Sequence, residues 1–361
     1  MDTTSTDGRG VVIAPDDLER HLADIAAGLG APEPVARQVA ASLVSANLAG
    51  HDSHGALLLP YWAQLVERGQ IRPDAAPEVL LDRGAVVALD GRFGFGPVTG
   101  HAAVDIARER ARAHGVACVV ARNANHIGRL GEFTSALAES GQVSLLLVNC
   151  QGSGQLLAPF GGIERRLTNN PVSIAAPAET SPVLLDMALS VAAEAKVWLA
   201  KAREQDIPEG WVVDSDGRPT TQPDDLFAGG TLLPLGGRAG GHKGYGLIVL
   251  VDIIAGILSG GGVCRPDAPE DFSNAFALFA LDVAPLCDPA AYAGELGRLR
   301  SYVTGATPAP GVEEILFPGD SEARAREARS VAGIPIEAST WSELAELARS
   351  VGVEPLGHPG G

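Results

Sequence analysis

The sequence predicts an α/β fold, in which helices and strands alternate along the chain. Residues with amphipathic helical spacing occur near both ends, and short apolar runs of strand length lie between them. The 44 glycines and 25 prolines indicate many tight connections between these elements. A chain of 361 residues with 46% hydrophobic content can bury a large core and divide into two or three lobes.

The N-terminal part is predicted to be helical. Residues 1–10 form a short polar stretch, which we expect to be a disordered tail. Pro15–Leu29 and Pro32–Leu48 carry apolar side chains at helical spacing and prolines in the first turn. Tyr61–Arg68 has the pattern of a short amphipathic helix. Residues 11–76 are therefore expected to form an N-terminal helical lobe.

The central part, residues 77–325, is predicted to form a sheet domain with a helical insertion. Its apolar runs are typical of buried strands, and the expected strands are Ala85–Asp90, Val116–Ala121, Val143–Asn149, Val172–Ala176, Val183–Met187 and Ala275–Leu281. Its expected helices are Gly100–His114, Val191–Lys201 and Leu247–Leu258. A capping box at Thr340 and Glu343 predicts a last helix to Ser350 within a C-terminal segment, residues 326–361.

Composition excludes several classes of function. A net charge of −17 argues against nucleic acid or an anionic membrane as the main partner, so an anionic substrate needs a local cation. The four cysteines contain no CxxC pair, which argues against a zinc ribbon or a disulfide scaffold. The chain opens with no signal peptide, and the apolar run Leu247–Leu258 is too short for a membrane span and is interrupted by Asp252. We therefore expect a cytoplasmic protein.

Two glycine-rich stretches raise the question of a nucleotide. Gly94–Gly100 follows a predicted strand, but its GxGxxxG spacing with an internal proline favours a tight connection over a Rossmann fingerprint. No P-loop motif occurs. Gly236–Gly246 places His242 and Lys243 among six glycines before a predicted helix. This stretch is either a phosphate-binding loop or a flexible surface loop with an incidental lysine.

The segment 47–61 is the most informative for function. His51 and His54 flank an acid and a hydroxyl where a helix ends at Gly50, a setting suited to proton transfer. A further histidine, His126, lies in a glycine-rich stretch that favours an open cleft. The simpler alternative is that these histidines only satisfy helix ends or pack in the core. A metal site formed by His51, His54 and His126 is another alternative, although no carboxylate-rich spacing supports it.

Six motifs in this order make the chain similar to the malate/L-lactate dehydrogenase family of the second type. The resemblance covers roughly residues 15–351. The family includes ureidoglycolate, sulfolactate and diketogulonate oxidoreductases and Δ1-piperideine-2-carboxylate reductases. The motifs are His51-Asp-Ser-His-Gly with Pro60-Tyr61, Asn125-His-Ile-Gly-Arg-Leu-Gly131, Ala158-Pro-Phe-Gly-Gly162 with Asn170-Pro171, Leu185-Asp-Met-Ala188, Asp214-Ser-Asp-Gly-Arg-Pro-Thr-Thr221 and His242-Lys-Gly-Tyr-Gly246.

The resemblance implies an NAD(P)-dependent oxidoreductase that interconverts a 2-hydroxy acid and a 2-oxo acid. It implies a non-Rossmann, sulfolactate-dehydrogenase-like fold with a mixed central sheet flanked by helices. The central domain would bind the cofactor, while the C-terminal segment returns to the N-terminal lobe, and the family is usually homodimeric. The motifs around residues 47–55 and 127–129 look nearest to the hydroxycarboxylate dehydrogenase B, or hydroxyphenylpyruvate reductase, branch.

The resemblance also implies roles for individual residues. A catalytic role is expected for His54 as the acid/base, for His126, and for Asp186, whose carboxylate would keep the imidazole pKa in a useful range. Substrate contacts are expected from Ser53, Leu58 and Arg129. Cofactor contacts are expected from Asn170, Pro171, Asp186, Met187, Ala188, His242, Lys243, Gly244, Gly319 and Asp320. No metal is required, and NAD is favoured over NADP.

Two departures from the family pattern leave the substrate open. Leu58 occupies the position of the family's usual carboxylate-binding arginine, and Thr168–Pro171 replaces its Gly-Thr-Asn-Pro turn. Arg129 is the nearest substitute for the missing cation. Alternatively, Arg129 is a surface residue paired with Glu132, and Leu58 lines an apolar pocket for a bulky substituent. The two alternative hypotheses are a reductase of cyclic 2-imino acids and a cofactor-binding protein without turnover.

Overall fold

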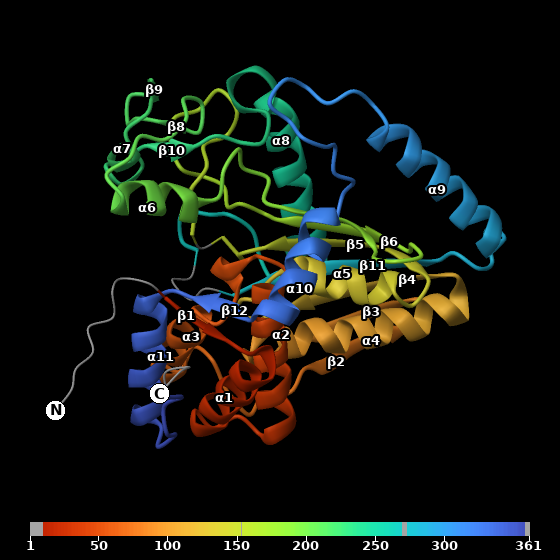
Figure 1. The fold of residues 1–361 in the computed structure, drawn as a ribbon, viewed down its shortest axis with the longest axis horizontal. Helices are drawn as coiled ribbons and strands as arrows, with labels where there is room; N and C mark the ends of the chain where they lie inside the picture. The colour runs from red at the N-terminus through yellow and green to blue at the C-terminus, as the bar shows by residue number, and fades with distance from the viewer. Residues whose placement is uncertain (1–9, 153, 269–272, 358–361) are drawn as a thin grey trace.

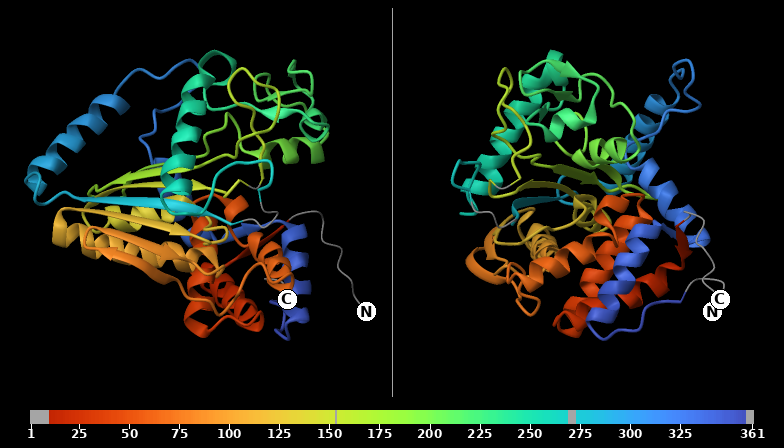
Figure 2. Two further views of the ribbon diagram at one scale, coloured as in Figure 1. Left: turned by 180° about the vertical axis from the view of Figure 1, so that it is seen from behind. Right: turned by 90° about the vertical axis from the view of Figure 1, so that its left-hand side faces the viewer.

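The structure is a computed structural model that describes residues 10–152, 154–268 and 273–357. Residues 1–9 of the expected N-terminal tail lie outside this part. The chain forms a central sheet domain, a helical lobe built from both ends of the chain, and a smaller subdomain above the sheet (Figure 1). The helical lobe and the subdomain both adjoin the same end of the sheet (Figure 2). This arrangement positions the candidate site.

The central sheet is mixed and has seven strands. Their order is β2-β3-β4-β11-β5-β6-β7; β3 and β4 are parallel, and all other neighbours are antiparallel. β3, β4, β5 and β7 therefore end at the same edge of the sheet, where β6 and β11 begin. The strands are β2 (Glu78–Arg83), β3 (Val86–Asp90), β4 (Val116–Arg122), β5 (Gln142–Asn149), β6 (Val172–Ala176), β7 (Val183–Met187) and β11 (Ala275–Asp282).

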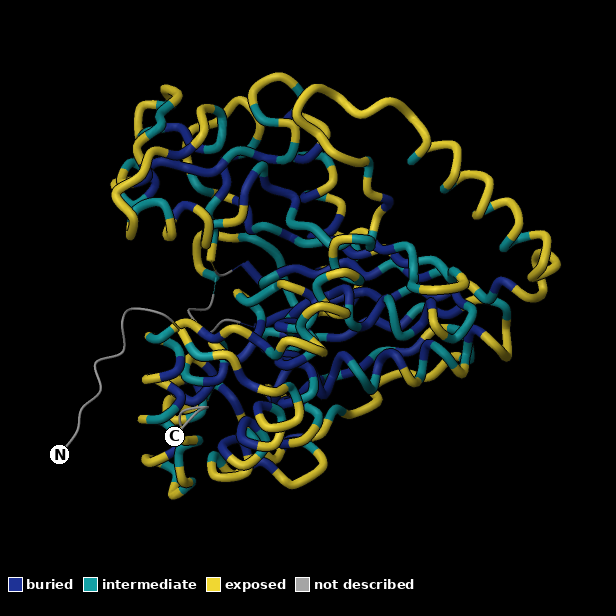
Figure 3. The backbone as a smooth tube through the Cα atoms, in the orientation of Figure 1, coloured by how far each residue is buried: buried dark blue, intermediate teal, exposed yellow. Residues whose placement is uncertain are grey.

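Helices cover the two faces of the sheet unequally. α4 (Gly96–His114) and α5 (Leu130–Ala138) pack on one face, with Val119, Leu146 and Leu278 of the strands fully buried beneath them. The other face carries α8 (Gly237–Val251) and the π-helical turns η2 (Asp252–Ile257), near the edge where β3, β4, β5 and β7 end. The remainder of that face is partly exposed (Figure 3).

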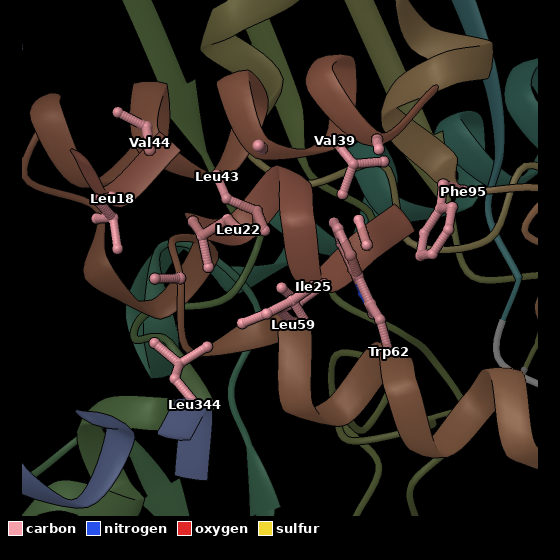
Figure 4. Packing of buried hydrophobic residues seen from close by; sticks show 14 of the residues in the cluster. Leu18, Leu22, Ile25, Val39, Leu43, Val44, Leu59, Trp62, Phe95 and Leu344 are labelled. Carbon is pink, nitrogen blue, oxygen red and sulfur yellow. The ribbon is translucent and has the colours of Figure 1, made fainter. Parts of the chain in front are cut away.

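The helical lobe joins the two ends of the chain. β1 pairs antiparallel with β12, so the C-terminal segment returns beside the N-terminal helices. Its core includes Trp62 and Leu344, and it reaches Phe95 at the start of α4 (Figure 4). The elements are β1 (Val11–Ile13), α1 (Pro15–Gly28), α2 (Glu33–Leu48), η1 (Asp52–His54), α3 (Leu58–Glu67), β12 (Ile334–Ile336) and α11 (Ala338–Ser350).

The remaining elements form the subdomain and two connecting helices. The subdomain contains α6 (Glu194–Ala202), β8 (Val212–Val213), β9 (Pro219–Thr220), α7 (Pro223–Phe227) and β10 (Thr231–Leu232). α9 (Pro289–Thr304) projects away from the body, and none of its residues is buried (Figure 3). α10 (Asp320–Ala332) leads back to the helical lobe. The expected boundary at residues 325/326 therefore falls inside α10.

Several helix boundaries differ from those expected; α4 begins four residues earlier than predicted and α6 three residues later. α8 begins at Gly237, so His242 and Lys243 lie within a helix and not in a loop before one. α11 begins at Ala338, so Thr340 lies inside the helix and its predicted capping box does not form. α3 begins at Leu58, three residues earlier than predicted, because Leu59 and Trp62 are buried in the lobe core.

The helix formed by α8 and η2 is longer than the apolar run suggested. By length and composition alone, Gly237–Ile257 is sufficient to cross a membrane. However, Ile248, Val251 and Ala255 pack into the core against the sheet, and Asp252 is buried and hydrogen-bonded. The helix therefore has a core-facing side, as core helices of globular proteins do.

Candidate active site

Strained backbone gathers at the edge where β3, β4, β5 and β7 end. Of the seven described non-glycine residues with positive φ, six lie at this edge and one, Glu204, lies elsewhere. Such conformations cost free energy and tend to cluster at functional sites. Ligands of open α/β sheets also bind beyond strand ends. The six residues are Arg92, Phe93, Asn123, Asn125, Gln151 and Asn170.

Two predicted histidines meet at this edge. His54 comes from η1 of the helical lobe, and His126 comes from the loop between β4 and α5. Their rings stack with centroids 5.6 Å apart and an interplanar angle of 28°. Gly96 allows the start of α4 to lie against the backbone of His126, since a Cβ atom at Gly96 would lie 2.1 Å from the carbonyl oxygen of His126. Gly96, which the sequence predicted to lie in a tight connection, thus lets α4 pack against the loop that carries His126.

The hydrogen bonds of His126 define its protonation. The backbone N–H of Gly128 donates to Nδ1 of His126 at 3.2 Å, so we infer that the neutral ring carries its proton on Nε2. Burial, with a smaller contribution from His54, lowers the pKa of His126 to about 3. At neutral pH His126 is therefore a neutral hydrogen-bond donor through Nε2.

His54 is held by its neighbour in sequence. The hydroxyl of the exposed Ser53 lies 3.0 Å from Nδ1 of His54, which leaves Nε2 of that ring for a substrate. Burial, with smaller contributions from the charges of His51 and Arg129, lowers the pKa of His54 to about 4. His54 is therefore also neutral at neutral pH. Ser53, expected to contact the substrate, contacts His54 in this structure.

Asp186 does not serve as the expected partner of a histidine. Its Oδ2 accepts a hydrogen bond from the backbone N–H of Gly131 at 2.6 Å and lies 3.8 Å from Nε of Arg129. Burial raises the pKa of Asp186, while Arg129 and the Gly131 N–H oppose this shift. The expectation that this carboxylate maintains the pKa of His54 is not supported, because its contacts are to the 129–131 segment.

Arg129 is buried, so it is not a surface residue paired with Glu132. Only 4% of its side chain is exposed. Glu132 instead binds Nε2 of His101 at 2.7 Å and the hydroxyl of Ser42 at 2.8 Å. The sequence predicts no role for His101. In the structure, its contact with Glu132 helps to join α2, α4 and α5 beneath the site. Leu58 is half-buried against the core of the helical lobe.

A polar network that the sequence did not reveal fixes the turn carrying the histidines. The carboxylate of Asp52 accepts hydrogen bonds from Asn47 at 2.6 Å and from Arg329 of α10 at 2.6 and 3.0 Å. Glu322, also on α10, lies 3.4 Å from Nε2 of His51. No motif marks Glu322 or Arg329, because the charge pattern of α10 is typical of a solvated helix.

The predicted cofactor residues near β6 and β7 lie at the same edge. Asn170 precedes β6 at a φ of 38°, and its buried amide donates to the carbonyl of Ile248 and the carboxylate of Asp252. Its side chain thus holds α8 and η2. Pro171 follows it, and Met187 and Ala188 lie at the end of β7. Oδ1 of neighbouring Asn169 is buried and has no hydrogen-bond partner among the described residues.

The predicted cations lie in the first turns of α8. His242 and Lys243 are exposed, and His242 meets the edge of the Phe160 ring. Gly244 is buried, and a Cβ atom there would lie 2.5 Å from the Leu235 carbonyl oxygen. This glycine allows the helix to pack against the turn that precedes it.

Gly319 and Asp320 begin α10 beside β7. Gly319 has a φ of 96°, and a Cβ atom there would lie 2.8 Å from the carbonyl oxygen of Pro182. The carboxylate of Asp320 accepts a hydrogen bond from the backbone N–H of Phe317 at 2.9 Å and pairs with Arg300 of α9. In this structure Asp320 therefore holds α9 and α10 together.

The described residues offer a nicotinamide nucleotide suitable groups but do not form a metal cluster. The exposed ammonium of Lys243 suits a phosphate, and the unpartnered Asn169 oxygen suits an amide donor. Among these residues, no group of three or more His, Cys, Asp or Glu side chains is arranged to hold a metal ion. All four cysteines are free thiols.

Comparisons with known proteins identify the family of this chain. Residues 13–345 match the family model described as malate/L-lactate dehydrogenase. Malate dehydrogenase of Pyrococcus abyssi is 36% identical over 96% of both chains. Hydroxycarboxylate dehydrogenase B of Escherichia coli strain K12 is 33% identical over 90% of both chains, so overall identity does not single out that branch.

The fold matches a solved structure of the expected type. Sulfolactate dehydrogenase from Methanocaldococcus jannaschii superposes with a TM-score of 0.84 and 29% identity, covering 95% of this chain and 98% of that one. The predicted sulfolactate-dehydrogenase-like fold, with its mixed sheet and N-terminal helical region, is therefore confirmed.

Proposed function

Because the chain belongs to the malate/L-lactate dehydrogenase family, we propose that it transfers a hydride between a nicotinamide cofactor and a 2-hydroxy or 2-oxo acid. The family makes it an oxidoreductase of the 2-hydroxyacid dehydrogenase class. The stacked His54–His126 pair at the strained edge of the sheet is the observation that carries this proposal. We propose that the chain groups with the hydroxycarboxylate dehydrogenase B branch because of its motifs around residues 47–55 and 127–129.

The two histidines divide the proton chemistry. In oxidation, neutral His54 accepts the hydroxyl proton of the substrate through Nε2, while Ser53 holds Nδ1. The Nε2 proton of His126 donates a hydrogen bond to the same substrate oxygen and stabilises its developing charge. In reduction, charge growing on that oxygen raises the proton affinity of the site, so His54 takes up a proton from solvent and passes it to the oxygen.

The cofactor contacts follow from the exposed and unpartnered groups. Lys243 would hold a phosphate or ribose, and Asn169 with the Asp186–Ala188 segment would hold the nicotinamide end. Gly244 allows a close backbone approach between α8 and the turn before it, whereas Gly319 lies beside the start of β7. A bound nicotinamide supplies the hydride chemistry, and the protein supplies alignment. We propose NAD ahead of NADP, and cytoplasmic residence, where the free thiols remain reduced.

A substrate panel tests the proposal directly. Oxidation and reduction should be followed by NADH and NADPH absorbance with aliphatic and aromatic 2-oxo acids, their hydroxy acids and cyclic 2-imino acids. We expect turnover of at least one 2-oxo acid with NADH. Turnover restricted to cyclic imino acids would replace the hydroxy acid assignment. Binding of NADH without turnover of any compound would indicate a cofactor-binding protein.

We also propose a homodimer, because the chain exposes unusually large apolar surfaces. The sixteen residues of α9 include none that is buried, and Leu299 and Tyr302 on it are exposed. An isolated helix without a buried face is not stable in water. The outer side of α8 and the uncovered sheet face are also apolar. Their exposed residues include Val116, Ile174, Leu185, Leu247, Leu250, Ile253 and Ile257.

A second copy of the chain suits these surfaces. Each molecule carries both the projecting helix α9 and an open apolar sheet face. In a two-fold dimer, the apolar surfaces of one chain would therefore be covered by those of the other. Contiguous apolar patches of this kind mark protein interfaces.

A further inference from the structure

Arg129 carries a buried positive charge that the rest of the protein leaves incompletely neutralised. It is the N-cap residue of α5, and only 4% of its side chain is exposed. Its Nε lies 3.8 Å from the carboxylate of Asp186, which is too long for a hydrogen bond. Among the described residues its guanidinium donates no hydrogen bond, and its Nε is buried without a partner.

Such an arrangement is costly unless a ligand completes it. A buried guanidinium has five N–H donors, and buried polar groups without partners destabilise the fold. Burial accordingly lowers the pKa of Arg129, while Asp186 and Glu322 act in the opposite direction. Gly131 leaves room for the side chain, because a Cβ atom there would lie 2.7 Å from Nη2 of Arg129. The guanidinium is therefore preorganised but not satisfied.

Its location connects it to the reacting groups. Arg129 lies three residues beyond His126 in the same loop, and its charge contributes to the low pKa of His54. It also lines a cavity of about 570 Å³ between α2, α5, β7 and α10, although neither His54 nor His126 is among the lining residues. Ser181 and Glu322 are among the other lining residues.

We propose that Arg129 binds the carboxylate of the substrate, an inference that rests on the proposed function. The planar guanidinium matches a carboxylate through paired N–H donors. In a 2-oxo acid the carboxylate is bonded directly to the reacting carbon, so its cation must lie beside the catalytic histidines. Asp186, held by the N–H of Gly131, positions the guanidinium without occupying its donors. The site then selects acids over neutral carbonyl compounds.

The test compares the buried arginine with an exposed one outside the cavity. Arg129→Leu and Arg129→Lys remove or alter the buried guanidinium. Arg37→Leu is the control, because Arg37 is exposed on α2, pairs with Glu33 and does not line this cavity. The measurements are kcat/KM for a 2-oxo acid and for its amide, the NADH dissociation constant, and the melting temperature.

We expect Arg129→Leu to lower kcat/KM for the acid by about 10- to 100-fold, the loss of one charged hydrogen-bonding contact. Activity with the amide and the affinity for NADH should change little, and Arg129→Lys should retain part of the activity. Added guanidinium ion should restore part of the activity of Arg129→Leu. Equal losses for acid and amide, or a change within about twofold for every acid, would overturn the proposal.

A binding measurement separates this inference from the proposed reaction. Oxamate is a 2-oxo acid analogue that is not reduced, and its affinity for the NADH-loaded protein can be measured by calorimetry. If the wild type turns over no 2-oxo acid, the proposed reaction fails. The carboxylate site stands if Arg129→Leu weakens oxamate binding and Arg37→Leu does not. Undiminished oxamate binding by the folded Arg129→Leu variant would overturn it.

Discussion

At the scale of single residues, the site depends on histidines kept neutral by burial. Nδ1 of His126 accepts a backbone N–H, so the neutral ring carries its proton on Nε2, and His54 presents Nε2 because Ser53 occupies the other nitrogen. A neutral imidazole can accept a hydroxyl proton immediately, whereas a cationic one must first lose its own. The geometry therefore favours His54 as the base of alcohol oxidation at neutral pH.

The pH dependence of His54→Asn and wild type tests this role. Wild-type kcat/KM for oxidation should fall with acid only near pH 4, since the pKa of His54 is lowered to about 4 from 6.5. Stability from the neutral ring is present above pH 6.5 and decreases as pH falls towards 4, so folding must be monitored by circular dichroism. His54→Asn should lower kcat by about 10²–10⁴ with NADH affinity retained.

The matched control for that experiment is His114→Asn, because His114 is exposed at the end of α4, far along the helix from the site edge. It should leave both kcat and the acid limb unchanged. Near-normal turnover by His54→Asn, or an acid limb at pH 6.5 in the wild type, would remove His54 from the acid/base role.

Lys243 provides a separate prediction at this scale. Its exposed ammonium in the second turn of α8 is expected to contact a phosphate or ribose, which is worth about 1.5–3 kcal/mol. Lys243→Ala should therefore raise the cofactor KM more than about tenfold while substrate KM changes little. Lys196→Ala, which removes another exposed lysine, on α6, is the control. An effect confined to substrate KM contradicts the assignment.

At the scale of elements, the sequence predicted what periodicity and burial determine. β6 and β7 occupy the predicted residues, and β4, β5 and β11 differ by one residue at an end, because continuous apolar runs are typical of buried strands. α9 and α10 contain no buried residue and so carry no apolar stripe to detect. The glycines of α8 oppose helix formation locally, and its start is set by packing of Gly244 against Leu235.

Candidate site residues divide in the same way. Motifs identified the histidines, but the contacts of Asp186 and the role of Glu322 depend on how α10 and the 126–131 loop meet in space. Spacing along one chain carries no information about such distant pairs. The strained edge could not be foreseen either, since it requires the order of strands in the sheet.

The π-helical turn η2 illustrates how an element fixes the cofactor edge. π-Helical turns often mark functional sites. The buried carboxylate of Asp252 accepts hydrogen bonds from the amides of Asn170 at 2.8 Å and Asn149 at 3.2 Å, and from the N–H of Cys264 at 3.2 Å. These donors come from the start of β6, the end of β5 and the loop after η2. Asp252 therefore joins three segments at the edge.

Asp252→Asn should loosen this junction, because its new amide faces two amide donors. We expect a loss of roughly 1–3 kcal/mol in the free energy of unfolding, measured by urea denaturation, and a higher cofactor KM. The swap Asp252→Asn with Asn170→Asp places a carboxylate opposite the new amide and should recover part of both losses. Asp216→Asn on an exposed turn serves as the control. Full stability of Asp252→Asn, or no recovery by the swap, argues against the junction.

At the scale of the whole molecule, catalysis requires two lobes to meet. His54 belongs to the lobe formed by both chain ends, whereas His126, Arg129 and Asp186 belong to the sheet domain. α10 connects them, because its N-cap residue Gly319 lies beside the start of β7 and the helix contacts the lobe through Arg329 to Asp52 and through Glu322 to His51. We propose on this basis that the helical lobe, residues 11–76 with the returning C-terminal segment, delivers the acid/base group to a cofactor held by the sheet domain.

The exposed arm and sheet face predict the assembly state. Light scattering should give twice the chain mass of 37.1 kDa for the wild type. Leu250→Glu on α8 and Tyr302→Glu on α9 place charge on the proposed interface and should shift the protein towards monomer with a lower melting temperature, because the charge opposes burial. Val331→Glu is the control, since Val331 is 89% exposed on α10 outside that surface. A wild type that remains monomeric at micromolar concentration, or dimers unaffected by both interface variants, would place these apolar surfaces outside any self-association.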